Sequence, residues 1–158
     1  MRLFISLIGA VVFLSSCDVN RVYEKNSDLE GRIWLEDSMI EFDVRLDDAS
    51  LPYNLYTNVR NGSAYSFYNL YVQYAIVDST GREIKKSLEN LILFDPKTGE
   101  PYGSGLGDVF DHQIPILNNY YFPDEGSYKV RLQQYMRRDT LEEVYSVGVR
   151  VELAGVED

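Results

Sequence analysis

The feature that most constrains the fold is an alternation of apolar and polar residues with a period of two. Over residues 40–46, Ile40, Phe42, Val44 and Leu46 are separated by charged residues. Successive side chains of a β-strand point to opposite faces, so this pattern predicts a strand with one buried face. The same alternation recurs over 70–76, 128–132 and 147–153, with shorter candidates at 33–35 and 53–60.

Residues that favour turns separate these runs. They form clusters at 47–48, 61–62, 78–81, 95–99 and 123–126. The pair Asn61-Gly62 is typical of a tight hairpin turn, so we expect a hairpin there. Short strands at regular spacing predict an all-β fold, a single antiparallel β-sandwich domain, which we place at residues 31–158.

One stretch of this domain fits two patterns. Ile84, Leu88 and Leu91 follow the spacing of an amphipathic helix, whereas residues 91–94 form an apolar run typical of a buried strand. We favour the strand, and the helix stays as the alternative.

The N-terminus has the organisation of a lipoprotein signal peptide. After Arg2, an apolar run over residues 3–14 is too short to span a bilayer, which takes roughly twenty residues. The following residues, Leu14-Ser15-Ser16-Cys17, resemble the lipobox of bacterial lipoproteins. We predict a cleaved signal peptide at 1–16 and a lipidated N-terminus with a tether at 17–30. An ordinary secretory signal or a buried apolar helix are the alternatives.

Composition supports an anchored, acidic domain. Cys17 is the only cysteine, so an internal disulfide and a cysteine-rich zinc site are excluded. The formal net charge is −10, which makes nucleic acid a poor partner and offers no polybasic patch to a membrane. Attachment to a membrane would therefore depend on the covalent lipid at Cys17, and we expect no other cofactor.

The segment from 94 to 112 is the strongest candidate for a binding loop. It has glycines that allow close backbone approach and acidic residues beside the only histidine. No lysine-serine or lysine-threonine pair follows the glycines, as a phosphate-binding loop would require. The acidic groups could hold calcium or act in acid–base chemistry, but side chains that cap turns are the stronger interpretation. The candidate residues are Asp95, Gly103, Gly105, Gly107, Asp108, Asp111 and His112.

Aromatic residues are unusually frequent, with 13 tyrosines and 7 phenylalanines. They cluster over residues 53–74 and 120–122. Aromatic pairs in a sandwich core are the favoured interpretation, and a stacking platform for sugar rings or a peptide is the alternative. The 25 acidic residues offer carboxylate pairs for a hydrolase, yet none is singled out, so we expect no enzyme.

Several blocks together resemble the GldH family of gliding-motility lipoproteins of Bacteroidota. They are Cys17-Asp18, 22–24, Trp34, 53–56, 58–61, 68–71, 93–99, 103–108, 110–112 and 133–137. The resemblance implies a lipid-anchored envelope protein, facing the periplasm from the inner or the outer membrane. It further implies a role in gliding and the linked type IX secretion machinery, with envelope proteins as partners and no catalytic residues. A surface glycan-binding lipoprotein that uses exposed tyrosines is the rival function.

Overall fold

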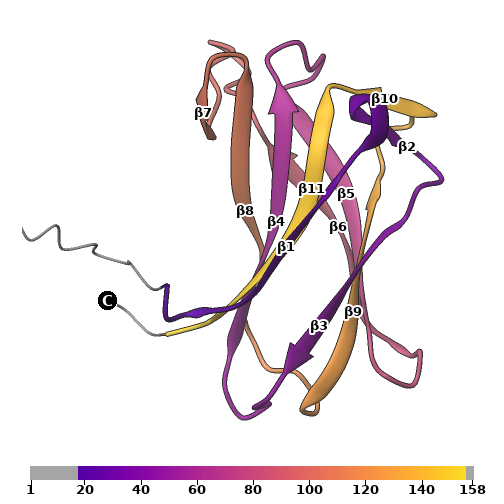
Figure 1. The fold of residues 1–158 in the computed structure, drawn as a ribbon, viewed down its shortest axis with the longest axis vertical. Coiled ribbons are helices and arrows are strands. Elements are labelled where there is room, and N and C mark those ends of the chain that lie inside the picture. The colour runs from indigo at the N-terminus through magenta and orange to yellow at the C-terminus, as the bar shows by residue number, and fades with distance from the viewer. Residues whose placement is uncertain (1–17, 156–158) are drawn as a thin grey trace, which may run out of the picture.

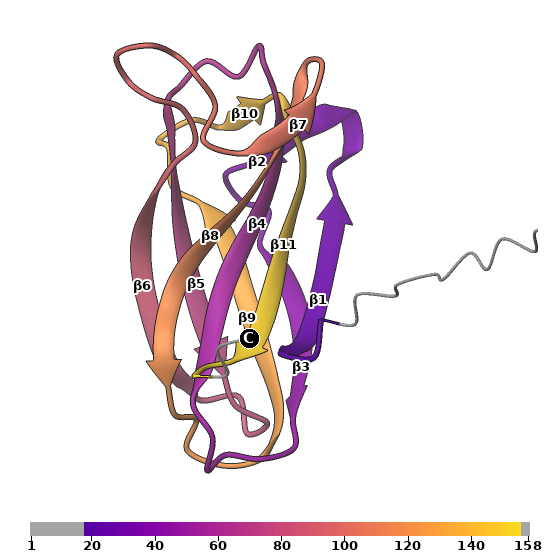
Figure 2. The ribbon, with the colours of Figure 1, turned by 90° about the vertical axis from the view of Figure 1, so that its left-hand side faces the viewer.

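The computed structural model describes residues 18–155, which fold into two antiparallel β-sheets packed face to face (Figures 1 and 2). The predicted all-β sandwich is confirmed. Cys17 and the predicted signal peptide lie outside the described residues. Among residues 18–155 no helix is long and apolar enough to span a membrane.

The first sheet has the strand order β1-β11-β4-β8-β7. Its strands are β1 (Arg21–Asp28), β11 (Val144–Leu153), β4 (Tyr53–Gly62), β8 (Val109–Tyr120) and β7 (Ser104–Leu106). The second sheet has the order β3-β9-β5-β6, with β3 (Ile40–Leu46), β9 (Gly126–Gln134), β5 (Asn69–Val77) and β6 (Glu83–Ile92). A small ribbon pairs β2 (Ile33–Leu35) with β10 (Thr140–Glu142) after a 3₁₀ turn, Glu30–Arg32.

The core lies between the two sheets and takes alternate residues from each strand. In β9, Tyr128, Val130 and Leu132 are at most 4% exposed. The residues between them are partly exposed on the outer face of the sheet. Trp34 of the small ribbon belongs to the core; it is completely buried, and its Nε1 donates a hydrogen bond of 3.0 Å to the Ser38 carbonyl. The strands predicted from alternation are therefore present.

The predicted tether over 17–30 is wrong for Arg21–Asp28, which forms β1. This strand pairs with β11 from Arg21 opposite Glu152 to Asp28 opposite Ser146. It looked like a linker because it is an edge strand whose side chains are mostly polar, and only Tyr23 packs against the core. Backbone pairing with β11 holds it in place, and that pairing leaves no apolar period in the sequence. The sandwich thus begins ten residues earlier than expected.

The hairpin predicted at Asn61-Gly62 is also wrong. These residues end β4, and the next long strand, β5, belongs to the other sheet. Asn61 is completely buried, and its Nδ2 donates a 3.0 Å hydrogen bond to the Gly62 carbonyl. By contrast, the strand favoured for the ambiguous stretch is present: β6 pairs with β5 through a turn in which the Gly81 amide donates to the Asp78 carbonyl.

Candidate functional site

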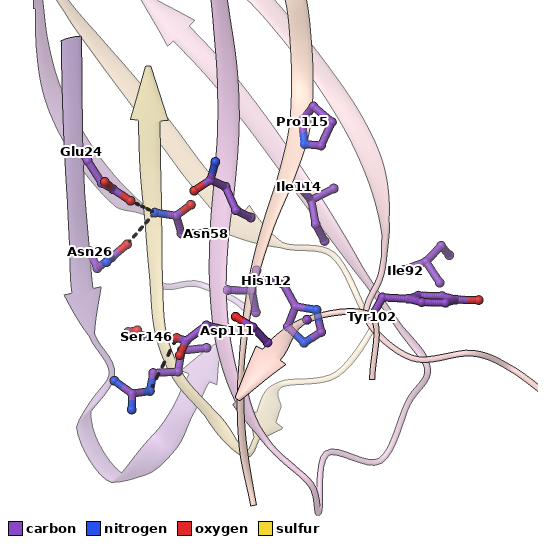
Figure 3. Close-up of a pocket in the computed structure, with 15 residues that line it drawn as sticks. Glu24, Asn26, Asn58, Ile92, Tyr102, Asp111, His112, Ile114, Pro115 and Ser146 are labelled. Carbon is purple, nitrogen blue, oxygen red and sulfur yellow. Dashed lines mark hydrogen bonds and ion pairs between the residues drawn. The ribbon is translucent and has the colours of Figure 1, made fainter. Parts of the chain in front are cut away.

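A cleft of about 580 Å³ opens over the outer face of the first sheet and extends to its edge at β8 and β7 (Figure 3). Side chains of β1, β11, β4, β8 and β7 line it together with Ile92 of β6, and most of them point outward because alternate residues of a strand point away from the core. The lining comprises Glu24, Asn26, Asn58, Val59, Arg60, Ile92, Tyr102, Gly103, Ser104, residues 111–115 and Ser146. Most of these lining residues are polar and carry amide, carboxylate or hydroxyl groups.

An amide bridge crosses the floor of the cleft. Asn58 Nδ2 on β4 donates to Glu24 Oε1 at 3.0 Å and to Asn26 Oδ1 at 3.1 Å, both on β1 (Figure 3). The strand between them, β11, has Gly148 at this level, opposite Asn58 and Asn26 in the two registers. A Cβ at Gly148 would lie 1.9 Å from Asn26 Oδ1. The hydrogen bonds of Asn58 across β11 therefore require a glycine at position 148 of that strand.

His112 lies on β8 opposite Val59, and its residue is only 4% exposed. Its ring meets the edge of Phe94 at 6.0 Å, and Gly103 passes so close that a Cβ there would be 2.7 Å from Nδ1. Burial lowers the pKa of His112 below its usual value near 6.5, more than Asp111 raises it. Within the described residues its Nε2 has no hydrogen-bond partner. The imidazole is thus a neutral packing group at the edge of the cleft.

Two acidic candidates have local partners instead of a common ligand site. Asp111 lies 3.7 Å from Arg60 Nε, an exposed ion pair on the outer face. Asp108 follows Gly107, whose φ of +70° lets the chain turn between β7 and β8. The Asp108 carbonyl accepts a 2.8 Å hydrogen bond from the Ser63 amide. Asp108 therefore fixes a turn and does not line the cleft.

Asp95 shapes the loop that leads to the cleft. Its carboxylate accepts hydrogen bonds from the Lys97 and Thr98 amides at 2.7 and 2.9 Å and from the Tyr102 hydroxyl at 3.0 Å. These bonds hold the pKa of Asp95 below its ordinary value. Of the seven residues predicted as a binding loop, the structure brings Gly103, Asp111 and His112 together at the cleft. It places Asp95, Gly105, Gly107 and Asp108 in turns or strand contacts.

Sequence reasoning missed a charged cluster on the same face. Arg150 of β11 has a side chain only 11% exposed, and it is surrounded by carboxylates. Its Nη1 donates to Glu24 at 2.9 Å, and its other nitrogens bind Asp18 and Glu152. Burial opposes the charge, yet these carboxylates raise the pKa of Arg150, and its hydrogen bond lowers the pKa of Asp18. Asp18 and Glu24 are near the start of the sequence, whereas Arg150 and Glu152 are near its end. No local motif therefore signals the cluster.

Comparison of the sequence with known proteins identifies relatives of the chain. The family model for the GldH lipoprotein matches residues 21–151, from the first residue of β1 almost to the end of β11. The chain belongs to the GldH lipoprotein family. A gliding motility lipoprotein GldH homolog of Christiangramia forsetii is 32% identical over 152 residues, covering 92% of this chain and 91% of that protein. The gliding motility lipoprotein GldH of Flavobacterium johnsoniae is 31% identical over 153 residues, covering 92% and 93%.

Among solved structures, that of infectious bursal disease virus Gx strain aligns with 88% of this chain and 31% of the viral chain. The TM-score is 0.32 and the identity 10%, so the alignment carries no functional information. The assignment to the GldH family therefore rests on sequence.

The aromatic clusters of this family member lie mainly inside the sandwich. Tyr53 and Phe122 meet edge to face at 5.8 Å, and Tyr65 and Tyr74 are at most 7% exposed. Burial raises the pKa of the Tyr74 hydroxyl to about 12. The favoured core interpretation holds for these rings. Others are exposed: Tyr68, Tyr71, Tyr102, Tyr121 and Tyr135.

The titratable groups on the cleft are arranged as bridges between strands. Among residues 18–155, no group of three or more histidines and acidic residues is placed to hold a metal ion. Burial favours the neutral form of Glu24, but hydrogen bonds from Arg21, Asn58 and Arg150 outweigh it and lower its pKa. A general acid needs the opposite shift, so Glu24 is suited to binding cations and amides.

Proposed function

We propose that the chain is a membrane-anchored envelope lipoprotein that supports gliding motility and the linked type IX secretion apparatus by protein–protein contact. The observation that carries the proposal is the family match over residues 21–151, together with two relatives that are both named for gliding motility. Because each relative aligns over more than nine tenths of its length, the comparison concerns the whole domain.

The anchor in this proposal is a diacylglycerol thioether on Cys17, which would become the N-terminal residue after cleavage behind Ser16. The support comes from the sequence Leu14-Ser15-Ser16-Cys17 at the end of a short apolar run, in a chain with no second cysteine. Buried methylenes contribute about 0.8 kcal/mol each, so two or three acyl chains hold a domain stably in a bilayer. The domain then lies on the periplasmic side of the membrane.

Protein contact is supported by an apolar patch on the outer face of the second sheet. Tyr71, Leu88, Ile92 and Tyr135 are 36 to 48% exposed. The registers Leu88–Gln73 and Ile92–Asn69 put both aliphatic residues on the same face as Tyr71, and the Tyr135 amide donates to the Tyr71 carbonyl at 2.8 Å. Exposed aromatic and aliphatic groups of this kind are typical of protein interfaces.

Deletion of the gene tests the proposal in cells. We expect a deletion strain to lose cell spreading and type IX secretion, with both restored by the wild-type gene. A gene encoding Tyr71→Arg should fail to restore them because it places a charge in the apolar patch. Leu106→Arg is the control, since Leu106 is 95% exposed at the tip of the β7–β8 turn. Normal spreading and secretion in the deletion strain would contradict the proposal.

Glycan binding is a second candidate function, favoured by one observation. The exposed ring of Tyr102 and the amides of Asn58 and Gln113 line the same cleft, and rings and amides together suit a sugar. Tyr53, Tyr65 and Tyr74 of the predicted platform are buried in the core, and none of the platform's tyrosines lines the cleft, which weakens this candidate. A glycan array probed with the purified domain and with Tyr102→Ala tests it; binding that the substitution abolishes would support it.

A further inference from the structure

The first residues of the mature domain are fixed to the first sheet. Asp18 binds the Arg150 guanidinium, and its carbonyl accepts a 3.4 Å hydrogen bond from the Arg21 amide. Two residues later, the Asn20 carbonyl accepts a 2.9 Å hydrogen bond from the Leu153 amide, and β1 begins at Arg21. No flexible linker thus separates Asp18 from the sandwich.

Since Asp18 directly follows Cys17, an acyl group on that cysteine is attached one residue from a fixed point, and consecutive Cα atoms are about 3.8 Å apart. We propose that the end of the first sheet where β1 begins lies against the lipid bilayer, with the Asp18–Arg150 ion pair as the positioning contact. The inference rests on the proposed lipidation of Cys17. It goes beyond anchoring, because it gives the domain one orientation on the membrane.

The surface at this end has the apolar groups that such a contact needs. Val19 is 70% exposed, and Val22 and Leu51 are each 40% exposed. The Ala154 amide donates to the Pro52 carbonyl at 2.9 Å, which brings the loop that carries Leu51 beside the last residues of β11 and the N-terminal entry. Apolar side chains at the edge of a domain insert favourably into the headgroup region.

Charge favours the same arrangement. The carboxylate next to the lipid would oppose a bilayer if it were free, because a desolvated anion is costly. Here Asp18 is not free: it is paired with Arg150, whose guanidinium also binds Glu24 and Glu152, so its charge is partly offset within the protein. The partner is therefore a lipid surface that needs no anionic headgroups.

The opposite end of the sheet provides an internal reference. At the end of the sheet where β1 begins, Tyr53 pairs with both Leu153 and Tyr120. At the other end, Leu106 pairs with Val109. The 12 residues of β8 separate these levels, roughly 40 Å at 3.3 Å per residue. Figure 1 shows β7 far from the point where β1 enters the fold. Leu106 should then be the position farthest from the bilayer.

Fluorescence quenching of the lipidated full-length protein tests this orientation. Trp34 is the only tryptophan and is completely buried, so it contributes a constant background. The variants Leu51→Trp and Leu106→Trp are purified from membranes and reconstituted into phosphatidylcholine vesicles with brominated acyl chains. We expect the Leu51→Trp reporter to lose roughly half its emission, since interfacial groups reach the acyl boundary, and Leu106→Trp to be unchanged.

Adding Arg150→Gln to each reporter tests the positioning contact. We expect the difference between the two reporters to shrink, whereas Arg45→Gln should leave it intact, because the Arg45–Asp47 pair is fully on the surface. Far-ultraviolet circular dichroism shows whether each variant is folded, and Asp18→Asn provides a milder variant if Arg150→Gln does not fold.

Equal quenching at both reporters would overturn the proposed orientation, and an unchanged difference in Arg150→Gln and Asp18→Asn would overturn the role of the ion pair. Flotation with the vesicles separates these results from failure of the anchor. A protein that does not float lacks its lipid, which contradicts the proposed function; a protein that floats without the quenching difference contradicts only the orientation.

Discussion

Asn58 and Asn26, which belong to two strands that are not neighbours, are joined by a 3.1 Å hydrogen bond over the backbone of Gly148. The bond links β4 to the edge strand β1 across β11. It gives β1 a side-chain attachment in addition to its backbone pairing, although β1 contributes little to the core. Any residue larger than glycine at position 148 would separate the two amides.

We therefore expect Gly148→Ala to destabilise the domain. The added Cβ would lie 2.6 Å from the Lys25 carbonyl as well as 1.9 Å from Asn26 Oδ1, so β1 must move. Overpacking of this kind costs about 2 kcal/mol. Urea unfolding followed by Trp34 emission measures it, and Lys25→Ala, at an exposed position of β1, should stay within about 0.5 kcal/mol of wild type. Addition of Asn26→Ala should recover part of the loss; an unaltered midpoint in the single variant would disprove the crowding.

Arg150→Met should also lower stability, because it removes the ion-pair partner of Asp18 and Glu152 and one of the two cations of Glu24, on a surface that is partly desolvated. We expect a loss of about 2 kcal/mol, less than for a fully buried pair since the cluster borders solvent. The control is Arg45→Met, which removes an exposed pair with Asp47 and should change stability by about 0.5 kcal/mol or less. If both substitutions cost the same, the cluster does not stabilise the fold.

The buried imidazole of His112 should make stability depend on pH. Burial lowers its pKa below 6.5 in the folded state, so the unfolded chain takes up the proton first as the pH falls. The full contribution is present above pH 6.5, and it declines as the pH drops towards the folded pKa. Unfolding free energies at about pH 7.5 and about pH 5.5 measure the decline, which His112→Phe should abolish while keeping the ring. A variant with the wild-type slope would assign the effect to other groups.

Cys17→Ser should release the protein from the membrane fraction. Without the thiol no diacylglycerol can be attached, and a chain whose full sequence has a formal net charge of −10 has no polybasic surface to replace it. Fractionation with immunodetection measures the distribution, and mass spectrometry of the wild-type protein shows whether acyl chains are on Cys17. Firm retention of Cys17→Ser in membranes would mean that something other than this lipid holds the protein.

The alternating runs predicted most of the fold, because a strand such as β9 buries one face and its apolar residues recur at every second position. The edge strand β1 escaped prediction since its neighbour β11 supplies the buried valines. Asn61-Gly62 has turn residues, but the chain crosses there to the other sheet and no hairpin forms. Local sequence thus identifies strands with an apolar face, whereas strand pairing between distant segments decides the edges.

The candidate site follows the same division. The segment 94–112 was recognisable from its glycines and acids, and three of its seven candidates reach the cleft. The other part of the cleft comes from Glu24, Asn26 and Asn58, which are ordinary surface residues in sequence. Only the register of β1, β11 and β4 brings them together, and no spacing within one segment encodes that register.

The antiparallel pairing of β1 with β11 brings the two limits of the described chain to the same corner of the sandwich, as Figure 2 shows. In the proposed orientation, a fluorescent protein or affinity tag joined behind Gly155 would lie against the membrane and disturb the contact of the domain with it. Gly107-Asp108, in the turn at the far tip, is the better insertion point for a label meant to report on the protein without disturbing it.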